Sequence, residues 1–473
     1  MLQVYNTYSL QKEKFTPQVS GKILMYLCGP TVYNYIHIGN ARSAVAFDTI
    51  RRYLEWRGYE VNFVSNFTDL GDKVIAQGEK EGLTEQEVAD KYAEAFHQDA
   101  GQLNVKPATT RPRATEYMAE MVRFVERLIE QGQAYEVDGD VYFSTTKFEN
   151  YTALSHQKMS ELEENAAGRL GDDDQEHKQD PTDFALWKKE TRPNVTAWPS
   201  PWGPGRPGWH LECSVMNDEL LGETIDIHAG GVDLTFPHHT NELAQSESYH
   251  HRQFVRYWLH NGFVNVNDEK MSKSLGNFVT IHDLLQTDID PQGLRFFLTK
   301  THYRRPISYS QDRLDQSQKE LDRLYRTYQA LERAKASSDG EIISQEVLSR
   351  VAELDAAFIQ AMDDDFNTEN ALTVIFDAAN FANRLLQEDA SLADLKTLQE
   401  RLQTWLGIFG IENLLPVKGI TAEQQDLLDQ RQAAREAKDF ATSDALRDKL
   451  LITGLIVRDS PQGQSWEFVD KSE

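Results

Sequence analysis

The stretch "KILMYLCGPTVYNYIHIGNARSAVAFDTIRRYLEWRGYEVNFVSNF", residues 22–67, decides the fold. Residues 22–29 predict a short apolar strand that ends at Gly29-Pro30, where a sheet ladder must stop. Apolar residues then recur at a helical period up to Gly58, and residues 59–67 return to strand character. Strand, loop, helix and strand in about 45 residues predict a βαβ unit, the opening of a parallel α/β sheet. Its first strand places Cys28 at the carboxyl edge, where open α/β sheets bind ligands.

The rest of the chain predicts an insertion and a helical C-terminal part. Helical patterns cover 84–99 and 115–131, and 134–145 read as a hairpin about an Asp138-Gly139 turn. The acidic residues 160–182 predict a solvated loop, and "PSPWGPGRPGWH" marks a boundary rich in proline and glycine. Strand, helix and strand return after 215, so we interpret 120–205 as an insertion between two halves of one sheet. From about 310 the pattern is almost entirely helical, with two short strands expected at the end.

The composition limits the possible functions. The 473 residues carry a net charge of −26, which argues against a general affinity for nucleic acid but leaves a specific nucleic-acid partner open. No apolar run approaches the roughly 20 residues of a membrane helix, and no signal peptide is visible. Two cysteines cannot form a disulfide framework, so we expect a cytoplasmic protein with no membrane partner.

Two segments have the character of phosphate-binding loops. "HIGNAR", residues 37–42, lies between the first strand and its helix, where backbone N–H groups and the helix dipole favour anions. His37 and Asn40 could donate to phosphate oxygens there, although an ordinary polar loop has the same composition. "DEKMSKSLGN", residues 268–277, places Lys270 and Lys273 three apart among hydroxyl groups, which fits an anion-binding loop or a solvated run of charge.

The two cysteines fit a metal site. Cys213 lies near the start of a predicted helix, and a later helix begins after Pro237 with His238 and Glu242 four residues apart on one face. Two thiolates, an imidazole and a carboxylate form a complete tetrahedral zinc set of Cys28, Cys213, His238 and Glu242. His239 is a possible substitute for His238, and lone cysteines can also be small buried hydrophobic residues.

Taken together, these motifs resemble the class I aminoacyl-tRNA synthetases, and among them the bacterial cysteinyl type. "HIGN" is similar to the family's His-x-Gly-His signature, and "KMSKS" matches its second signature letter for letter. "LCGPTVYNYIHIGNAR", "GWHLECS", "DIHAGGVDLTFPHHTNE" and "TSDALRDKL" follow in the family's order over essentially the whole chain. Two positions depart from the pattern: Asn40 replaces a histidine, and Gly71 stands where an acidic residue is expected.

The resemblance implies a two-step reaction. The carboxylate of L-cysteine attacks ATP, supplied with Mg²⁺, to give cysteinyl-adenylate, and the cysteinyl group is then transferred to the 3′ end of tRNA(Cys). The resemblance assigns catalysis to His37, Asn40, Lys270 and Lys273. It adds Gly39 and Ser272 to the ATP contacts. Thr68, Trp209 and His228 are expected in the amino-acid pocket, although Trp209 and His228 could equally be core residues.

Zinc explains how cysteine would be chosen. Shape alone separates cysteine from serine by only about 1–3 kcal/mol. One Zn²⁺ per subunit, held by the four residues above, would select the substrate thiolate because a hydroxyl is a poorer soft ligand.

The resemblance also implies an organisation of the chain, which is expected to be a monomer. We expect a Rossmann-like catalytic domain, an inserted connective domain and a mostly α-helical tRNA-binding region. The two halves of the catalytic domain are expected at 1–119 and 206–265, with the connective insertion between them at 120–205. A signature-loop segment at 266–310, a helical bundle at 311–415 and an anticodon-recognition domain at 416–473 are expected to follow. On helix 424–439, Arg431, Arg435 and Lys438 could face tRNA or merely solvent.

Two alternatives stay open. A zinc-dependent ligase that joins cysteine to an amino-sugar would share the catalytic core but would not need residues 424–473. A non-catalytic paralogue that binds tRNA or cysteine is the second alternative, although His37, Lys270 and Lys273 argue against it.

Overall fold

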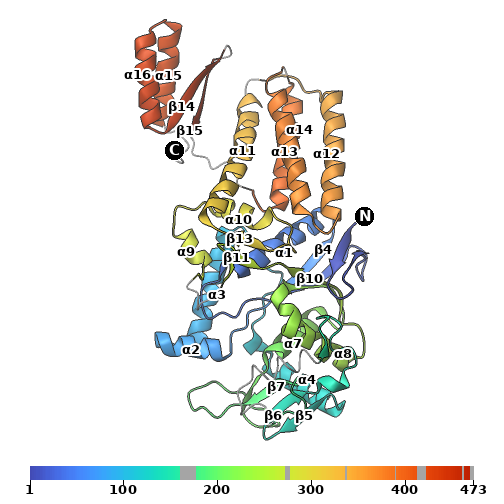
Figure 1. Cartoon of the computed structure of the whole chain (residues 1–473). Coiled ribbons are helices and arrows are strands. Elements are labelled where there is room, and N and C mark those ends of the chain that lie inside the picture. The colour runs from blue at the N-terminus through green and yellow to red at the C-terminus, as the bar shows by residue number, and fades with distance from the viewer. Residues whose placement is uncertain are drawn as a thin grey trace. The chain divides into compact units, whose positions relative to one another are not determined.

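The computed structural model describes residues 1–159, 177–271, 277–335, 338–388, 390–412, 422–460 and 463–468. The chain divides into two compact units, Met1–Glu412 and Asn413–Glu473, and each is described by itself (Figure 1). Most of the predicted acidic loop lies outside the described residues, as do Ser272 and Lys273. None of the helices in the described ranges is long and apolar enough to cross a membrane.

Four parallel strands form the central sheet of the first unit, in the order β10-β9-β3-β4. The strands are β3 (Lys22–Leu27), β4 (Glu60–Ser65), β9 (Ile225–Gly231) and β10 (Val255–Asn261). Helix α1 (Ile38–Trp56) connects β3 to β4, which confirms the predicted βαβ unit. Leu27 at the end of β3 lies opposite Ala229 of β9 and Ser65 of β4, so the ends of distant segments meet at one edge. Cys28 follows directly at this edge.

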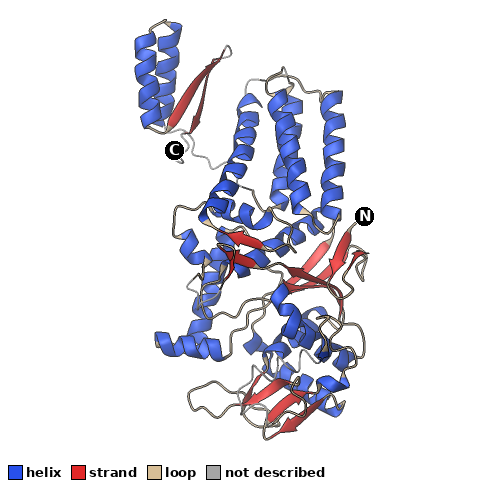
Figure 2. Ribbon diagram, in the orientation of Figure 1, coloured by secondary structure: helices blue, strands red, loops and turns tan. Residues whose placement is uncertain are grey.

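The insertion between the two halves of the sheet forms its own small sheet (Figure 2). Its antiparallel strands are β5 (Ala134–Val137), β6 (Asp140–Phe143), β7 (Phe184–Lys189) and β8 (Gly205–Pro207). The predicted hairpin is confirmed: Asp138 and Gly139 have φ angles of 54° and 96°, the positive values that a tight hairpin turn needs. A buried core joins this region to three helices that precede or follow it, α4 (Met118–Glu130), α7 (Trp209–Leu221) and α8 (Thr240–His250).

A second buried core surrounds α1 and positions its N-terminus. The elements around it are α2 (Asp72–Glu81), α3 (Glu85–Gln102), β11 (Val264–Val266), β12 (Glu269–Lys270), α9 (Ile281–Leu285), α10 (Pro291–Thr299) and β13 (Ile307–Tyr309). The backbone N–H of Ile38 donates to the carbonyl of Val279 at 3.0 Å, and that of Ile281 donates to Ile36 at 2.9 Å. The chain that follows the KMSKS string is therefore fixed against the start of α1. A separate strand pair, β1 (Gln3–Asn6) and β2 (Gln11–Lys14), lies at the N-terminus.

Four helices complete the first unit, and Figure 1 shows them side by side. They are α11 (Gln311–Lys335), α12 (Gln345–Asp363), α13 (Thr368–Leu385) and α14 (Leu392–Ile408). Trp405 and Phe358 stack in their interior with ring centroids 5.2 Å apart. The helical prediction for this part of the chain is confirmed.

The second unit contains α15 (Ala422–Glu436), α16 (Phe440–Ile452), β14 (Leu455–Ser460) and β15 (Gly463–Phe468). The two terminal strands pair as predicted. One expectation is wrong: Arg431 is fully buried and donates to both carboxylate oxygens of Asp459 at 2.9 and 2.8 Å. Arg435 also donates to Asp459. The strand pair covers the side of α15 that carries Arg431, so this residue cannot reach tRNA.

Candidate active site

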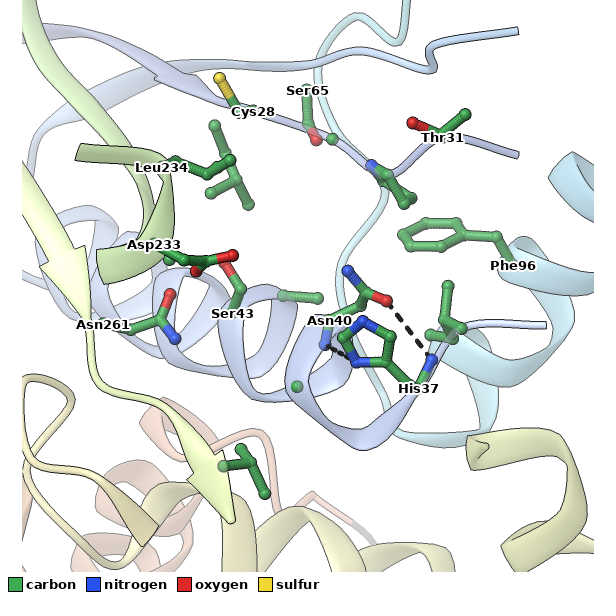
Figure 3. Close-up of a pocket in the computed structure, with 18 of the residues that line it drawn as sticks. Cys28, Thr31, His37, Asn40, Ser43, Ser65, Phe96, Asp233, Leu234 and Asn261 are labelled. Atoms are coloured by element: carbon green, nitrogen blue, oxygen red, sulfur yellow. Dashed lines mark hydrogen bonds between the residues drawn. The ribbon is translucent and has the colours of Figure 1, made fainter. Parts of the chain in front are cut away.

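His37 and Asn40 form hydrogen bonds with each other at the N-terminus of α1. The Asn40 N–H donates to His37 Nδ1 at 3.2 Å, and the His37 N–H donates to Asn40 Oδ1 at 3.3 Å (Figure 3). This reciprocal capping box fixes both signature side chains and uses only the oxygen of the Asn40 amide. The asparagine that departs from the family pattern is therefore a structural partner of His37.

Gly39 allows the His37 ring to lie back over the first turn of α1. A Cβ atom at residue 39 would come within 2.9 Å of both Cε1 and Nδ1 of that ring. The geometry of the cap thus depends on the absence of a side chain at this position, which gives the glycine of "HIGN" a steric role.

These residues line a pocket of about 420 Å³ at the carboxyl edge of the sheet. Cys28, Gly39, Trp209 and Lys270 lie in its wall with His37 and Asn40. Lys270 is exposed, and Met271 approaches the position of a Cβ on Gly39 to 3.9 Å. Met271, in the described start of the KMSKS string, therefore lies near the "HIGN" segment, although more than two hundred positions separate the two in the sequence.

The four predicted metal ligands come together beside this pocket. One possible ligand atom from each of Cys28, Cys213, His238 and Glu242 lies within 4.8 Å of the others. Cys28 Sγ is 3.7 Å from Cys213 Sγ and 3.5 Å from Glu242 Oε1, and His238 Nε2 is 3.0 Å from Glu242 Oε1. The cluster has the donor set expected for zinc. A second group of four, Cys28, His228, His239 and Glu242, meets the same distance limit.

The ionisable groups of the cluster shift one another's pKa values. Burial raises the pKa of the Cys28 thiol, whose hydrogen bond lowers the pKa of Cys213 to about 6. Burial alone would raise the pKa of Glu242, but the charges of His228 and His238 hold it well below its usual range. Burial alone would lower the pKa of His238, but the charges of Glu242 and Cys213 raise it to about 10. The acidic groups and His238 therefore share one buried charge network, and a metal ion would take the place of its protons.

The three expected amino-acid contacts occupy different places. Trp209 is 45% exposed, lines the pocket and stacks on His238 with centroids 4.2 Å apart. Thr68 is buried and donates to Glu212 Oε2 at 2.8 Å. His228 is fully buried, and its Nε2 lies 2.7 Å from Glu242 Oε2. The structure places His228 behind Glu242 as a support, and not in the wall of the pocket.

Sequence reasoning missed two histidines beside the cluster. His210 Nδ1 lies 2.9 Å from His238 Nδ1, and His260 Nε2 lies 2.8 Å from His239 Nδ1. His239, the proposed substitute ligand, places its Nε2 3.3 Å from Cys28 Sγ. His260 stands near the carboxyl end of β10, so the rule that ligand sites gather at that edge could have found it.

Comparison with known proteins matches three family models to consecutive parts of the chain. Residues 14–319 match the class I (C) tRNA synthetase catalytic domain, 357–413 a DALR domain, and 417–466 a cysteinyl-tRNA ligase anticodon-binding domain. Among solved structures, methionyl-tRNA synthetase from Mycobacterium tuberculosis has a TM-score of 0.60 at 17% identity, covering 89% of this chain and 96% of that one. The fold and the paired signature segments define a class I aminoacyl-tRNA synthetase.

The curated relatives show which family within this class the chain belongs to. Cysteine–tRNA ligases from Leuconostoc citreum and Latilactobacillus sakei subsp. sakei are 52% and 53% identical over 471 and 474 residues, covering 98% of this chain and 99% of each relative. The chain belongs to the cysteine–tRNA ligase family. It is an enzyme that joins cysteine to tRNA, and the match to an anticodon-binding domain supports this function over the amino-sugar ligase.

Proposed function

We propose that this enzyme recognises cysteine through one zinc ion held by Cys28, Cys213, His238 and Glu242. The observation that supports this proposal is the convergence of two thiols, an imidazole and a carboxylate within 4.8 Å of one another. When bound, zinc would take the sulfur of the substrate as a further ligand and favour its thiolate, a preference that the serine hydroxyl cannot satisfy. Cys28 lines the pocket and connects the cluster to the space for the substrate.

The alternative set with His228 and His239 fits zinc less well. It offers one thiol in place of two, and both of its imidazoles have other tasks, since His228 supports Glu242 and His239 contacts His260. His228 contacts Glu242 as an outer residue that supports a metal-bound carboxylate does. We therefore assign His228 and His239 to the surroundings of the metal.

The residues around α1 would bind ATP, with its Mg²⁺, and direct the first step. The helix N-terminus, His37 and the amide of Asn40 would face the α-phosphate, where charge develops during adenylate formation. Lys270 also lines the pocket, and we propose that Ser272 and Lys273, outside the described residues, act with it. Trp209 lines the pocket and would cover the bound cysteine. We propose Thr68, which donates to Glu212, as a further contact of the amino acid.

Each segment of the chain would have a separate role. We propose catalysis by 1–119, 206–265 and 266–310, a connective role for 120–205, and tRNA(Cys) binding by 311–415 and 416–473. The enzyme would act as a monomer in the cytoplasm, where a reducing environment keeps both ligand cysteines as thiols.

Charging of total tRNA with labelled cysteine tests the proposal, with labelled serine as the matched competitor. We expect cysteine to be attached to tRNA and serine to be refused at the level of adenylate formation. Serine-dependent exchange of pyrophosphate at a rate near that of cysteine would contradict selection by a metal.

A further inference from the structure

Arg111 lines the catalytic pocket without a carboxylate to neutralise it. Within the described part of the chain, its guanidinium donates to Ser65 Oγ at 3.2 Å and lies 4.9 and 4.7 Å from the ring centroids of Phe67 and Phe96. Burial lowers the pKa of Arg111 to about 10, with no acidic group acting in the opposite direction. An unpaired cation in such surroundings is costly unless a ligand supplies the missing charge.

The backbone holds Arg111 in this place. Residues on both sides pair with the chain at and beyond the end of β4, because the Ser65 N–H donates to Thr110 at 3.2 Å and the Phe67 N–H donates to Pro112 at 2.9 Å. The side chain is therefore preorganised at the same sheet edge as the start of α1. In Figure 3, Phe96, a neighbour of Arg111, lies on the side of Asn40 opposite to Asp233 and Asn261.

The pocket is polarised by this arrangement. The described lining contains two carboxylates, and one of them, Asp48, already pairs with Arg52 and Arg295. The other, Asp233, lies beside Asn261 across the pocket and would repel phosphate there while accepting hydrogen bonds from hydroxyl groups. Although the protein has a net charge of −26, Arg111 places a positive charge on one side of the N-terminus of α1. This charge suits the phosphates, the most highly charged part of ATP.

We propose that Arg111 binds the β- and γ-phosphates of ATP and stabilises the pyrophosphate that leaves. This inference rests on the adenylate-forming step of the proposed function. In that step a carboxylate oxygen of cysteine bonds to the α-phosphorus, the bond from phosphorus to the bridging oxygen breaks, and its electron pair departs with pyrophosphate. A fixed cation at the leaving group lowers the barrier, whereas a cation on the attacking carboxylate would make it a weaker nucleophile.

Arg111→Met is the main test, with Arg111→Lys as the conservative variant. Arg113→Met is the matched control, because Arg113 lies two residues away and pairs with Asp90 near the surface. Calorimetric titration of the full chain with magnesium pyrophosphate should show about 10- to 100-fold weaker binding for R111M, the usual loss for a charge-assisted contact. R111K should retain part of the affinity, and R113M should bind like the original protein.

Kinetic measurements distinguish binding of the leaving phosphates from other roles of Arg111. In cysteine-dependent ATP–pyrophosphate exchange, R111M should raise the KM for ATP and for pyrophosphate while the KM for cysteine and the transfer from preformed adenylate to tRNA stay unchanged. The melting temperature of unliganded R111M should be equal or higher, because the half-buried guanidinium has no carboxylate partner that its removal would leave unpaired. Unchanged pyrophosphate binding, a raised KM for cysteine or tRNA alone, or a fall in melting temperature with normal kinetics would each overturn the assignment. If the original protein shows no cysteine-dependent exchange, the proposed function fails, and the pyrophosphate titration still decides the role of Arg111.

Discussion

His238 Nε2 lies 3.0 Å from Glu242 Oε1, one helical turn apart where η4 (Thr235–His239) runs into α8. The spacing of four residues places both side chains on one face, and the sheet edge brings Cys28 to the same point. The other carboxylate oxygen of Glu242 contacts His228, so the two oxygens face different partners. This carboxylate connects the metal cluster to the buried interior.

Glu242→Gln should remove zinc from the protein. The neutral amide is a weaker zinc ligand than the carboxylate. We therefore expect zinc affinity to fall by more than the about 10- to 100-fold that is typical when a residue supporting a ligand is lost. His228→Ala removes such a partner and should fall within that range. Zinc content per chain, measured by plasma mass spectrometry after dialysis against a graded chelator, checks both. Ser214→Ala, next to Cys213, is the control, and equal zinc retention in E242Q and S214A would refute the ligand set.

Asn40→Ala should reduce both stability and adenylate formation. The variant breaks the hydrogen bond from the His37 N–H, and loss of a cap costs about 1 kcal/mol. Thr84→Ala breaks the equivalent capping box at the start of α3, away from the catalytic loop. Urea unfolding should show similar losses for the two variants, while only N40A lowers kcat for ATP–pyrophosphate exchange. Equal kcat values in N40A and T84A would show that the cap of α1 has no catalytic task.

Gly39→Ala should separate stability from activity. Alanine favours a helix over glycine by about 0.5–1 kcal/mol, yet a Cβ here would displace the His37 ring. Gly101 in α3 has open space where a Cβ would stand, so Gly101→Ala should gain this stability and keep full activity, whereas in Gly39→Ala the loss of the His37 cap offsets the gain. We expect a raised KM for ATP in G39A alone. A G39A enzyme with normal ATP kinetics would contradict the steric role of the glycine.

Asp459→Asn should destabilise the second unit by about 1–3 kcal/mol, because the buried Arg431 loses its carboxylate partner and keeps only neutral acceptors. Hydrogen bonds from Arg431 hold the pKa of Asp459 below its ordinary value of 3.8. The folded unit therefore binds fewer protons than the unfolded chain just below that pH. The contribution is complete above about pH 5 and is lost as the pH falls through the lowered pKa.

Hydrogen exchange of residues 422–460 in the full chain, corrected for the intrinsic rate at each pH, measures this effect. Asp448→Asn changes an exposed aspartate of α16 and should leave protection unchanged. If D459N and D448N are equally protected, the ion pair contributes nothing to the fold.

The local features of the fold could be predicted from the sequence. The βαβ unit, the Asp138-Gly139 hairpin and the i, i+4 spacing of His238 and Glu242 depend on neighbours in the chain, which the sequence displays directly. The meeting of Cys28 with Cys213 was predicted from donor types, because two thiolates, an imidazole and a carboxylate complete a tetrahedral zinc set. The spatial convergence of the four proposed ligands is therefore the part of the site in which sequence reasoning was most informative.

The remaining features depend on long-range packing. A helical period put Arg431 and Arg435 near one face, but only the position of the β14–β15 pair decides that this face is covered. His228 lies in a strand buried on both sides, where no alternation indicates which way a side chain points. Arg111 lies in an irregular segment between α3 and α4, where no periodic pattern predicts contact with the pocket.

X-ray absorption at the zinc edge of the full chain tests the central claim most directly. The account predicts zinc with two sulfur ligands at about 2.3 Å in the free enzyme, and a third sulfur when cysteine is added but not when serine is added. A zinc-free active enzyme, or a sulfur count that cysteine leaves unchanged, would contradict selection of the substrate by the metal.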